Sequence, residues 1–465
     1  MFRFFTALLL TCLIAINTSF AAEPNGDLTQ TQINSLLKSV PLDGPTKAAM
    51  NAVTNNDIKD LAINRDITAV TDDIFSFKLP AKGITDQESS GRCWMFAGLN
   101  LMRQSVAEKY DLDDFELSQS YLAFWDMLEK SNEFLEYIID TRKRDIRDRE
   151  LDKRMESPVS DGGYWNYVTH IVQKYGVVPK MYMNETKSSA NTGRMQNVLN
   201  ELLRRDAARL RGMANKSDKD LRQEKMQMLQ DVMRVLVINY GRPPLQFEWR
   251  TTDSTGKVSE PVVYTPQQFY SEVIGLDLSQ YVSLACYPIH PFGKNYSINA
   301  TRYMPGLPDV TFINVDAAQM KSYALKALLD SNRVWFGCDV SYESHGKKGL
   351  LIKGLYDYED LFGIKLDMTK TERLDYRGQS SNHAMVLSGV DMVNGNPRKW
   401  LVENSWGKDR GDGGFFTMSD EWFDDYVMNV IVPRKYLPDD VAAIADQKPT
   451  PLPIWDPVWK SLRAE

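Results

Sequence analysis

The pattern of apolar and polar positions predicts a buried helix that begins at Cys93. From there to residue 109, apolar side chains return every three or four residues, as on one face of a helix. Arg103, Glu108 and Lys109 occupy polar positions of the same stretch. We therefore expect a central helix whose apolar face is buried.

Two apolar runs in the last third of the chain predict strands. Residues 381–390 form a run whose length and β-branched residues favour a buried strand over a helix. Residues 399–403 form a second run, followed by the sequence Asn-Ser-Trp-Gly. The short connection between the two runs predicts a tight strand pair.

A third pattern, between residues 194 and 240, predicts a helical hairpin. Met and Leu residues recur at helical intervals on both sides of a break formed by Gly212 and residues 215–218. Residues 194–234 carry ten Lys or Arg and six Asp or Glu, a mixture typical of a solvated helix face. The apolar residues either pack against the protein's own core or form an interface with another chain.

Charge and composition exclude several classes of function. The formal net charge of -7 argues against general binding to nucleic acid. The sequence has no phosphate-binding loop, no Rossmann glycine pattern and no Cys-x-x-Cys pair, and its four histidines are scattered. We expect no cofactor and no metal. No segment after the N-terminal leader approaches 18 consecutive apolar residues, so we expect no membrane-spanning helix.

The segment around Cys93 has the layout of a nucleophilic cysteine. Gln87 lies six residues before it, and the predicted helix starts at the cysteine itself. The free N–H groups and the positive dipole end of a helix favour a thiolate, the form of cysteine that attacks a carbonyl. Taken alone, a cysteine at a helix start is more often a small buried apolar residue.

A base for this thiol must come from the four histidines. His383 lies in the first predicted strand, and Asn404 follows it by 21 residues, where its amide can orient the imidazole. A single histidine in an apolar strand is more often a core residue. Together with Cys93, however, the two form the Cys-His-Asn version of the nucleophile, base and orienter triad.

These motifs resemble those of papain-like cysteine peptidases, in particular the bleomycin hydrolase and aminopeptidase C branch. The similar blocks are Ser-Gly-Arg-Cys-Trp-Met-Phe-Ala at 90–97, Asn-His-Ala-Met at 382–385 and Val-Glu-Asn-Ser-Trp-Gly at 402–407. A fourth block, Asp-Gly-Gly-Tyr-Trp at 161–165, is similar to the strip that lines the substrate cleft of such enzymes. The resemblance implies an α+β papain-like fold, with a helical subdomain and a β-barrel-like subdomain.

The resemblance also implies the roles of four catalytic residues. Cys93 would be the nucleophile, His383 the general base and then acid, and Asn404 the orienter of His383. Gln87 would donate to the oxyanion. Physical chemistry supports this role independently, because the Gln87 side-chain amide and the Cys93 N–H can both donate to the negative charge that develops on the carbonyl oxygen.

Three further residues receive roles from the same resemblance. Trp406 would shield the hydrogen bond between the histidine and the asparagine from water. Gly162 and Gly163 would line the substrate-binding cleft, although two glycines can also simply form a turn.

The chain is longer than its motifs require. Cys93 and His383 are 290 residues apart, whereas ordinary papain-like enzymes separate them by about 130 to 150. The surplus predicts a structured insertion, because long structureless loops are rare in compact domains. By resemblance, this insertion would join six copies into a homohexamer. The expected organisation is a signal peptide at 1–21, the first catalytic part at 22–180, the helical insertion at 181–290, the β-rich catalytic part at 291–436 and an extended C-terminal arm at 437–465.

The N-terminus predicts export. An apolar stretch at residues 4–16 follows Arg3, and small residues precede a cleavage position after Ala21. We therefore expect a periplasmic or extracellular protein. In an oxidising compartment, Cys286 and Cys338 could form a disulfide or remain as buried thiols.

The C-terminal arm helps to distinguish an aminopeptidase from an endopeptidase. Alternating prolines at residues 448–457 favour an extended chain. The arm resembles the tail that lies in the active-site cleft of bleomycin hydrolases. By that resemblance the terminal carboxylate of Glu465, or of Ala464 after self-processing, would meet the α-ammonium of a peptide substrate. The expected function is a cysteine aminopeptidase. The alternatives are an endopeptidase or acyltransferase on the same site, and a non-catalytic secreted binding protein.

Overall fold

The computed structural model describes residues 26–81 and 83–461, which form two compact units. The first unit combines the residues up to Ile63 with Tyr356–Lys365. It holds the helices α1 (Gln30–Ser39), α2 (Gly44–Val53), α3 (Ile58–Ala62) and α14 (Tyr358–Phe362). Its two segments meet where the Asp357 N–H donates to the Ala62 carbonyl at 2.7 Å.

A large mixed sheet dominates the second unit, which joins Asn64–Leu355 to the residues from Leu366 onwards. Adjacent strands are antiparallel except in three parallel pairs, β14 with β5, β6 with β4, and β12 with β9. Over the described chain the strand order is β14 (Thr450–Leu452), β5 (Lys294–Ile298), β6 (Thr311–Asn314), β4 (Tyr281–Ala285), β13 (Val427–Pro433), β7 (Val334–Cys338), β10 (His383–Val393), β11 (Asn396–Glu403), β12 (Phe415–Ser419), β9 (Leu350–Leu351) and β8 (Ser344–His345), and β1 (Phe77–Lys78) pairs with β10.

The predicted strand pair is confirmed as β10 and β11. The two-residue loop between them consists of Asn394 and Gly395, which both have positive φ angles, 51° and 80°. This backbone conformation matches the twist of a hairpin and is readily adopted by Asn and Gly. At its other end β10 begins with His383, which pairs with Cys338 of β7.

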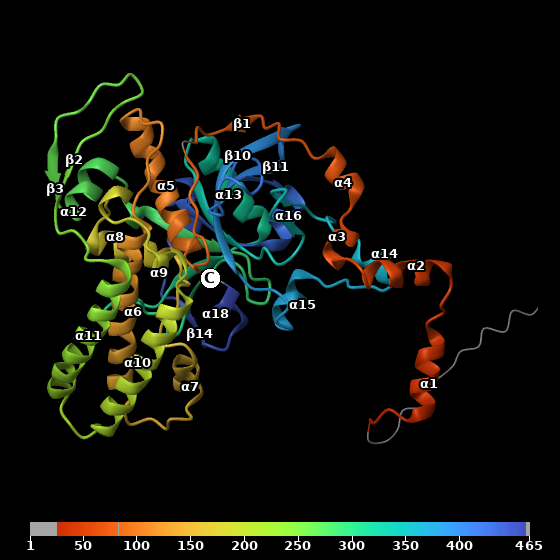
Figure 1. Ribbon diagram of the computed structural model, residues 1–465, viewed down its shortest axis with the longest axis horizontal. Helices are drawn as coiled ribbons and strands as arrows, with labels where there is room; N and C mark the ends of the chain where they lie inside the picture. Colours follow the sequence, from red (N-terminus) through yellow and green to blue (C-terminus); the bar gives the residue numbers. More distant parts are fainter. Residues whose placement is uncertain (1–25, 82, 462–465) are drawn as a thin grey trace, which may run out of the picture. The chain divides into compact units, whose positions relative to one another are not determined.

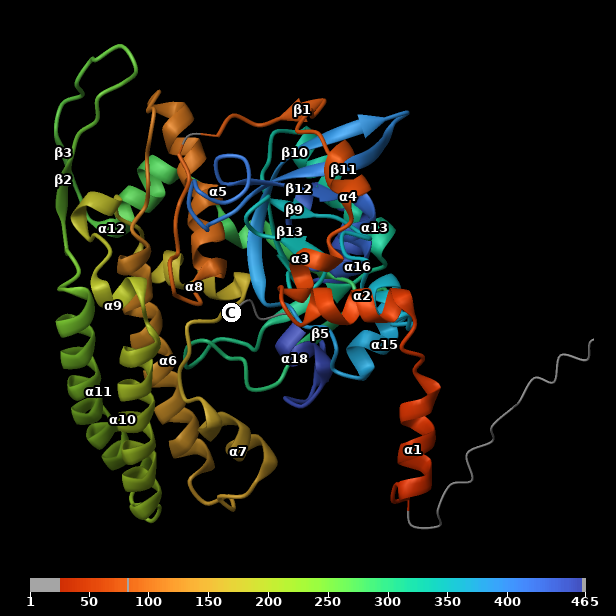
Figure 2. The ribbon, with the colours of Figure 1, turned by 45° about the vertical axis from the view of Figure 1, so that its right-hand side comes forward.

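The predicted helices are also present. The buried helix is α5 (Cys93–Lys109), and the predicted hairpin consists of α10 (Gly193–Gly212) and α11 (Asp218–Tyr240). Ser217 caps α11 by accepting from the Asp220 N–H, so the predicted break is where one helix ends and the next begins. Figures 1 and 2 show α10 and α11 side by side with α6 (Gln119–Thr141).

The apolar side chains of the hairpin divide between two environments. Leu199, Leu203 and Leu236 are fully buried in the same core as α5 and α6. Met226 and Ile238 are 58% and 71% exposed. The hairpin therefore packs against its own core while also presenting apolar side chains at its surface.

The other elements connect these parts. Among the described residues they are α4 (Arg65–Val70), α7 (Arg149–Glu156), α8 (Trp165–Tyr175), α9 (Lys187–Ala190), α12 (Pro266–Gln268), α13 (Ala317–Leu329), α15 (Lys370–Asp375), α16 (Asp420–Tyr426), α17 (Asp439–Ile444) and α18 (Pro457–Ser461), four short helical turns at Lys180–Tyr182, Phe269–Ile274, Leu278–Gln280 and Arg434–Tyr436, and a separate hairpin of β2 (Phe247–Trp249) and β3 (Val262–Tyr264). None of the helices in the described part of the chain is long and apolar enough to cross a membrane.

The second unit contains two apolar cores. One contains most of the helical residues, and the other fills the space between the strands and α13 and α16. Trp335 of β7 belongs to the helical core, and its Nε1 donates to the Trp94 carbonyl at 3.0 Å. This contact joins the sheet to the turn of α5 that carries Cys93.

Three features differ from the sequence-based expectations. Arg103 occupies a polar position in the pattern but is 1% exposed, because its guanidinium pairs with the buried carboxylate of Glu403 at 2.7 Å. Strand β4 belongs to the large sheet, although it lies before the expected boundary at residue 290. The C-terminal arm is extended only at β14, since α17 and α18 are short helices within it.

Candidate active site

Cys93 is the first residue of α5 and is fully buried. The preceding loop is held in place by Asp161, whose Oδ2 accepts from the Gly91 N–H at 3.0 Å. The Asp161 carbonyl accepts from the Trp94 indole at 2.6 Å. Asp161 therefore holds the residues on both sides of the cysteine. Because Cys93 is the first residue of the helix, it lies in the turn whose N–H groups have no partner within the helix.

His383 and Asn404 contact each other directly. The imidazole Nε2 lies 2.8 Å from Asn404 Oδ1. A carbonyl oxygen only accepts, so Nε2 carries the proton and Nδ1 is the basic nitrogen of the neutral ring. Burial lowers the pKa of His383 to about 4, and the hydrogen bond with Asn404 opposes that shift.

The indole of Trp406 covers this hydrogen bond. It stacks on the His383 ring with centroids 4.6 Å apart, as the shielding role requires. Since His383 is 2% and Asn404 1% exposed, the pair is protected from water. A dry environment strengthens the hydrogen bond that fixes the tautomer.

Gln87 lies between the cysteine loop and the strand that ends at Asn404. Its Nε2 donates to the Ser90 carbonyl at 2.7 Å, and its Oε1 accepts from Ser405 Oγ at 2.7 Å. Its backbone N–H also donates to the Ser405 carbonyl at 2.9 Å. A side-chain amide has two N–H groups, so one remains to donate to a bound oxyanion.

The structure pairs His383 with Asn404 and connects Gln87 to the segments that carry Asn404 and Cys93. Gln87 is linked to the residue that follows Asn404 and to the loop that precedes Cys93. The helix of Cys93 packs against β10, which begins at His383, and against β7. Residues from distant parts of the chain thus converge at the junction of α5 with β7 and β10.

The predicted glycine strip lies beside this junction. Gly163 packs against the Trp94 indole so closely that a Cβ atom there would overlap the ring. The carbonyl of Gly162 accepts from Lys130 Nζ at 2.8 Å. Both glycines are buried, and their backbone is held by groups that contact the helix of Cys93.

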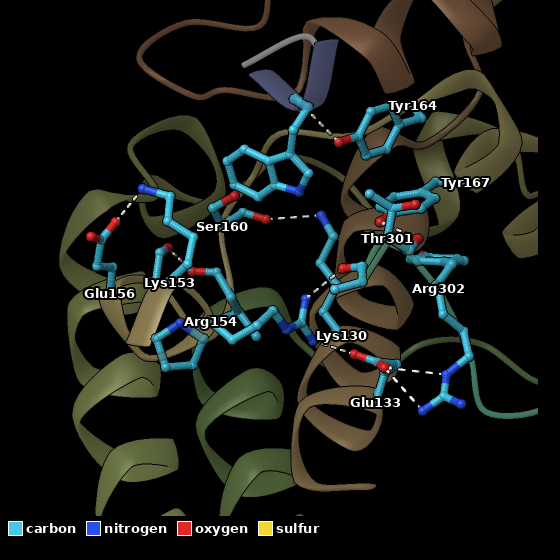
Figure 3. Close-up of a pocket in the computed structure, with 16 residues that line it drawn as sticks. Lys130, Glu133, Lys153, Arg154, Glu156, Ser160, Tyr164, Tyr167, Thr301 and Arg302 are labelled. Carbon is cyan, nitrogen blue, oxygen red and sulfur yellow. Dashed lines mark hydrogen bonds and ion pairs between the residues drawn. The ribbon is translucent and has the colours of Figure 1, made fainter. Parts of the chain in front are cut away.

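A pocket of about 250 Å³ borders the strip and reaches α18. In Figure 3, Lys130 points to the Ser160 carbonyl, and Arg154 and Arg302 both point to Glu133. Trp459 of α18 lines the same pocket, and its carbonyl accepts from the Tyr164 hydroxyl at 3.1 Å. The C-terminal arm therefore runs next to the predicted cleft.

Two contacts hold the arm before it reaches the pocket. Asp456 pairs with His290, with 3.0 Å between Oδ2 and Nε2. The Arg149 guanidinium lies 4.4 Å from the centroid of the Trp455 ring. Glu465 and Ala464, which the sequence assigns to substrate binding, lie outside the described residues.

Cys286 and Cys338 are free thiols in the structure, so the disulfide alternative is not adopted. Burial raises the pKa of Cys286, and it raises the pKa of Cys338 well above its usual value. Both thiols are therefore poor nucleophiles at neutral pH.

Sequence reasoning missed three supporting residues. Ser405 and Asp161 lie within the motif blocks at 402–407 and 161–165, but the motifs gave neither residue a role. Arg92, which precedes Cys93, is buried and pairs with Glu185 at 2.9 Å. Burial raises the pKa of Glu185, but the Arg92 charge more than compensates, so that pKa is lowered. No pattern in the sequence indicates this pairing.

A cysteine at the start of a central helix, packed against a sheet that positions a hydrogen-bonded histidine and asparagine, defines the class of papain-like cysteine peptidases. The model of the Peptidase C1-like family matches residues 27–459. The chain belongs to this family.

Similar proteins agree with this assignment. Aminopeptidase C of Lactococcus lactis subsp. cremoris is 38% identical over 435 residues, covering 93% of this chain and 98% of that protein. Bleomycin hydrolase of Mus musculus is 34% identical over 449 residues, with coverages of 93% and 98%. The crystal structure of PepW from Lactobacillus rhamnosis has a TM-score of 0.91 at 36% identity, covering 94% of this chain and 99% of that one. The resemblance to the bleomycin hydrolase and aminopeptidase C branch is thus confirmed, and the protein is a cysteine peptidase.

Proposed function

We propose that the protein is a cysteine aminopeptidase that removes N-terminal residues from peptides through a thioester on Cys93. The observation that carries this proposal is the hydrogen bond between His383 and Asn404, placed on the sheet that faces the start of α5. The near full-length similarity to aminopeptidase C supports the substrate class.

Each residue has a chemical task in this proposal. Nδ1 of His383 takes the proton of the Cys93 thiol, and the thiolate attacks the carbonyl carbon of the first peptide bond. The oxyanion accepts from the Cys93 N–H and the Gln87 amide. Removing one such donor typically costs about 10²- to 10³-fold in rate.

Collapse of the tetrahedral intermediate breaks the C–N bond. The proton on His383 goes to the leaving nitrogen, and the shortened peptide departs. His383 then removes a proton from water, which attacks the thioester and releases the first residue. Asn404 keeps the imidazole in one orientation through both steps.

The C-terminal arm is proposed to restrict the enzyme to the first residue. A carboxylate at the end of the arm would attract the substrate's α-ammonium and exclude chains that continue past it. The position of Trp459 beside the glycine strip supports this role, because it brings the arm next to the cleft.

Two properties beyond catalysis are also proposed. The leader at residues 1–21 would direct export to the periplasm or the extracellular space. The exposed apolar residues of α10 and α11 would contribute to a homohexamer, because exposed apolar side chains often mark an interface.

Thiol labelling tests the site directly. At neutral pH, iodoacetamide should modify Cys93 and abolish peptidase activity, because the start of α5 and the His383 base favour its thiolate. Cys286 and Cys338 have neither feature, and burial raises the pKa of both, so they should stay unmodified. His383→Ala should slow labelling of Cys93 without affecting the other two. Loss of activity with Cys93 unmodified would overturn the assignment of the nucleophile.

A further inference from the structure

The loop at residues 346–349 contacts the indole that covers the catalytic histidine. Trp406 stacks on His383 with ring centroids 4.6 Å apart. A Cβ atom on Gly346 would lie 3.4 Å from Cζ3 of the same indole, so the loop backbone is in van der Waals contact with the ring. Two successive contacts therefore connect this loop to His383.

A second loop, at residues 407–412, follows Trp406 and is joined to the first. The Gly411 N–H donates to the Lys347 carbonyl at 3.2 Å. A Cβ atom on Gly349 would overlap the Gly411 Cα, so the two backbones are in close contact. The hydrogen bond and this close packing hold both loops next to the indole.

The two loops carry an excess of positive charge at the surface. Their cations are all exposed and are Lys347, Lys348, Lys408 and Arg410. The loops contain two carboxylates, Asp409 and Asp412, and Asp86 lies beside Gly407, so the cations are in the majority. Within the described part of the chain, none of the four cationic side chains forms an ion pair or a hydrogen bond. They are therefore available to an anion from solution.

The proposed reaction brings the leaving peptide to this region. His383 donates a proton to the leaving nitrogen, so the leaving peptide starts beside the imidazole. The C-terminal arm lies next to the glycine strip, where the substrate's N-terminus is proposed to bind. A leaving dipeptide spans about 7 Å when extended. That length is comparable to the two contacts between His383 and the first loop, and lysine adds the reach of a long flexible side chain.

We propose that the four cations of these loops bind the C-terminal carboxylate of short peptide substrates. This inference rests on the proposed aminopeptidase function, because that function makes the leaving peptide the part of the substrate with the free carboxylate. Tripeptides would be preferred over the same peptides with a blocked C-terminus. The substrate would then be recognised at both of its ends, by the arm at the ammonium and by the loops at the carboxylate.

Two matched tripeptides test this inference. One has a free C-terminal carboxylate and the other a C-terminal amide, so they differ in charge at that end alone. The quantity measured is the ratio of their kcat/KM values for the full-length chain, at low and at high salt. Raising the salt from about 0.01 M to about 1 M shortens the Debye length from about 30 Å to about 3 Å. The protein's net charge of -7 would by itself favour the more positive amide, so a preference for the carboxylate requires a local cationic site.

Three double variants locate the site. Two of them each remove both cations of one loop, and they are Lys347→Gln with Lys348→Gln, and Lys408→Gln with Arg410→Gln. The matched control is Lys216→Gln with Lys219→Gln, which removes two exposed lysines near the connection between α10 and α11. All three change the net charge by the same amount.

At low salt we expect the wild-type protein to prefer the carboxylate about fivefold, at the upper end for an exposed ion pair. Each loop variant should lower this ratio about twofold or more, high salt should abolish the preference, and the control should retain it. No preference in the wild-type protein at low salt, or an equal loss in the control, would overturn the carboxylate site while the aminopeptidase function stands. A preference that survives in both loop variants would overturn it as well. If neither tripeptide loses its first residue, the proposed function itself fails.

Discussion

His383 Nε2 and Asn404 Oδ1 are 2.8 Å apart, and this contact connects the first residue of β10 with the residue that follows β11. The hairpin between the two strands sets the separation, so the sheet itself determines which ring nitrogen is left basic. Because the ring is buried, its neutral form is favoured. A neutral imidazole can accept the thiol proton.

Loss of the Asn404 amide should impair catalysis more than folding. In Asn404→Ala the imidazole loses its orienting partner, and we expect kcat to fall by about 10²-fold or more. The pKa of His383 should also decrease, since the hydrogen bond raises it in the wild-type protein. The pH dependence of kcat and an NMR titration of His383 would measure these effects. Unchanged values for both would contradict the orienting role.

Burial of His383 should make the stability of the fold depend on pH. Its pKa is about 4 in the folded protein and 6.5 in a model peptide. Between these values the unfolded chain binds a proton that the folded chain does not, so acidification favours unfolding. The contribution is complete above pH 6.5 and is lost as the pH falls to 4, amounting to roughly 3 kcal/mol.

Urea denaturation of the wild-type protein and of His383→Gln at several pH values isolates this effect. As the pH falls from 6.5 to 4, the free energy of unfolding of the wild-type protein should fall more than that of the variant. A difference that does not vary with pH would show that His383 titrates normally.

The pairing of Asp456 with His290 should govern substrate selection. Asp456→Asn keeps a side-chain oxygen for the Val458 N–H but removes the charge that attracts the histidine. We expect the arm to loosen and the cleavage of N-acetylated peptides to increase severalfold relative to free peptides. Mass spectrometry of the products would detect the change. A product pattern identical to that of the wild-type protein would argue that this pair does not position the arm.

The buried ion pair of Arg103 and Glu403 should be important for stability. The two side chains are 1% and 0% exposed, and Glu403 directly precedes Asn404. Arg103→Met removes the closer charge partner of this buried carboxylate and leaves, among the described residues, only Arg333, whose Nε is 4.0 Å from Glu403 Oε2. We therefore expect a loss near the lower end of the about 3 to 5 kcal/mol in free energy of unfolding that breaking a buried pair typically costs.

The double variant Arg103→Met with Glu403→Gln is the matched control, and it should recover part of that loss. Urea denaturation measures both. If the double variant were less stable than the single one, the cost would come from lost packing rather than from the unpaired charge.

Local patterns in the sequence predicted the elements that hold the site. Cys93 begins a helix and His383 a strand because the periodicity and the flanking residues specify each over a short segment. The Asp456-Pro457 dipeptide at the start of α18 is also a helix start signal, but the neighbouring prolines led to an extended prediction.

Long-range partners could not be predicted in the same way. Ser405 and Gln87 are 318 residues apart, and Arg103 and Glu403 are 300 apart. Their pairing depends on how the sheet packs against α5, which no local pattern encodes. A buried charge such as Arg103 has the same sequence signal as an exposed one, so only the packing reveals its partner.

Cys93 should act on peptides only when their N-terminus is free. The most direct measurement is the incubation of one peptide, with either a free or an acetylated N-terminus, with the reduced protein and with Cys93→Ala. We predict release of the first residue from the free peptide only, and no release by the variant. Internal cleavage of the acetylated peptide at a comparable rate, or turnover by Cys93→Ala, would contradict the account.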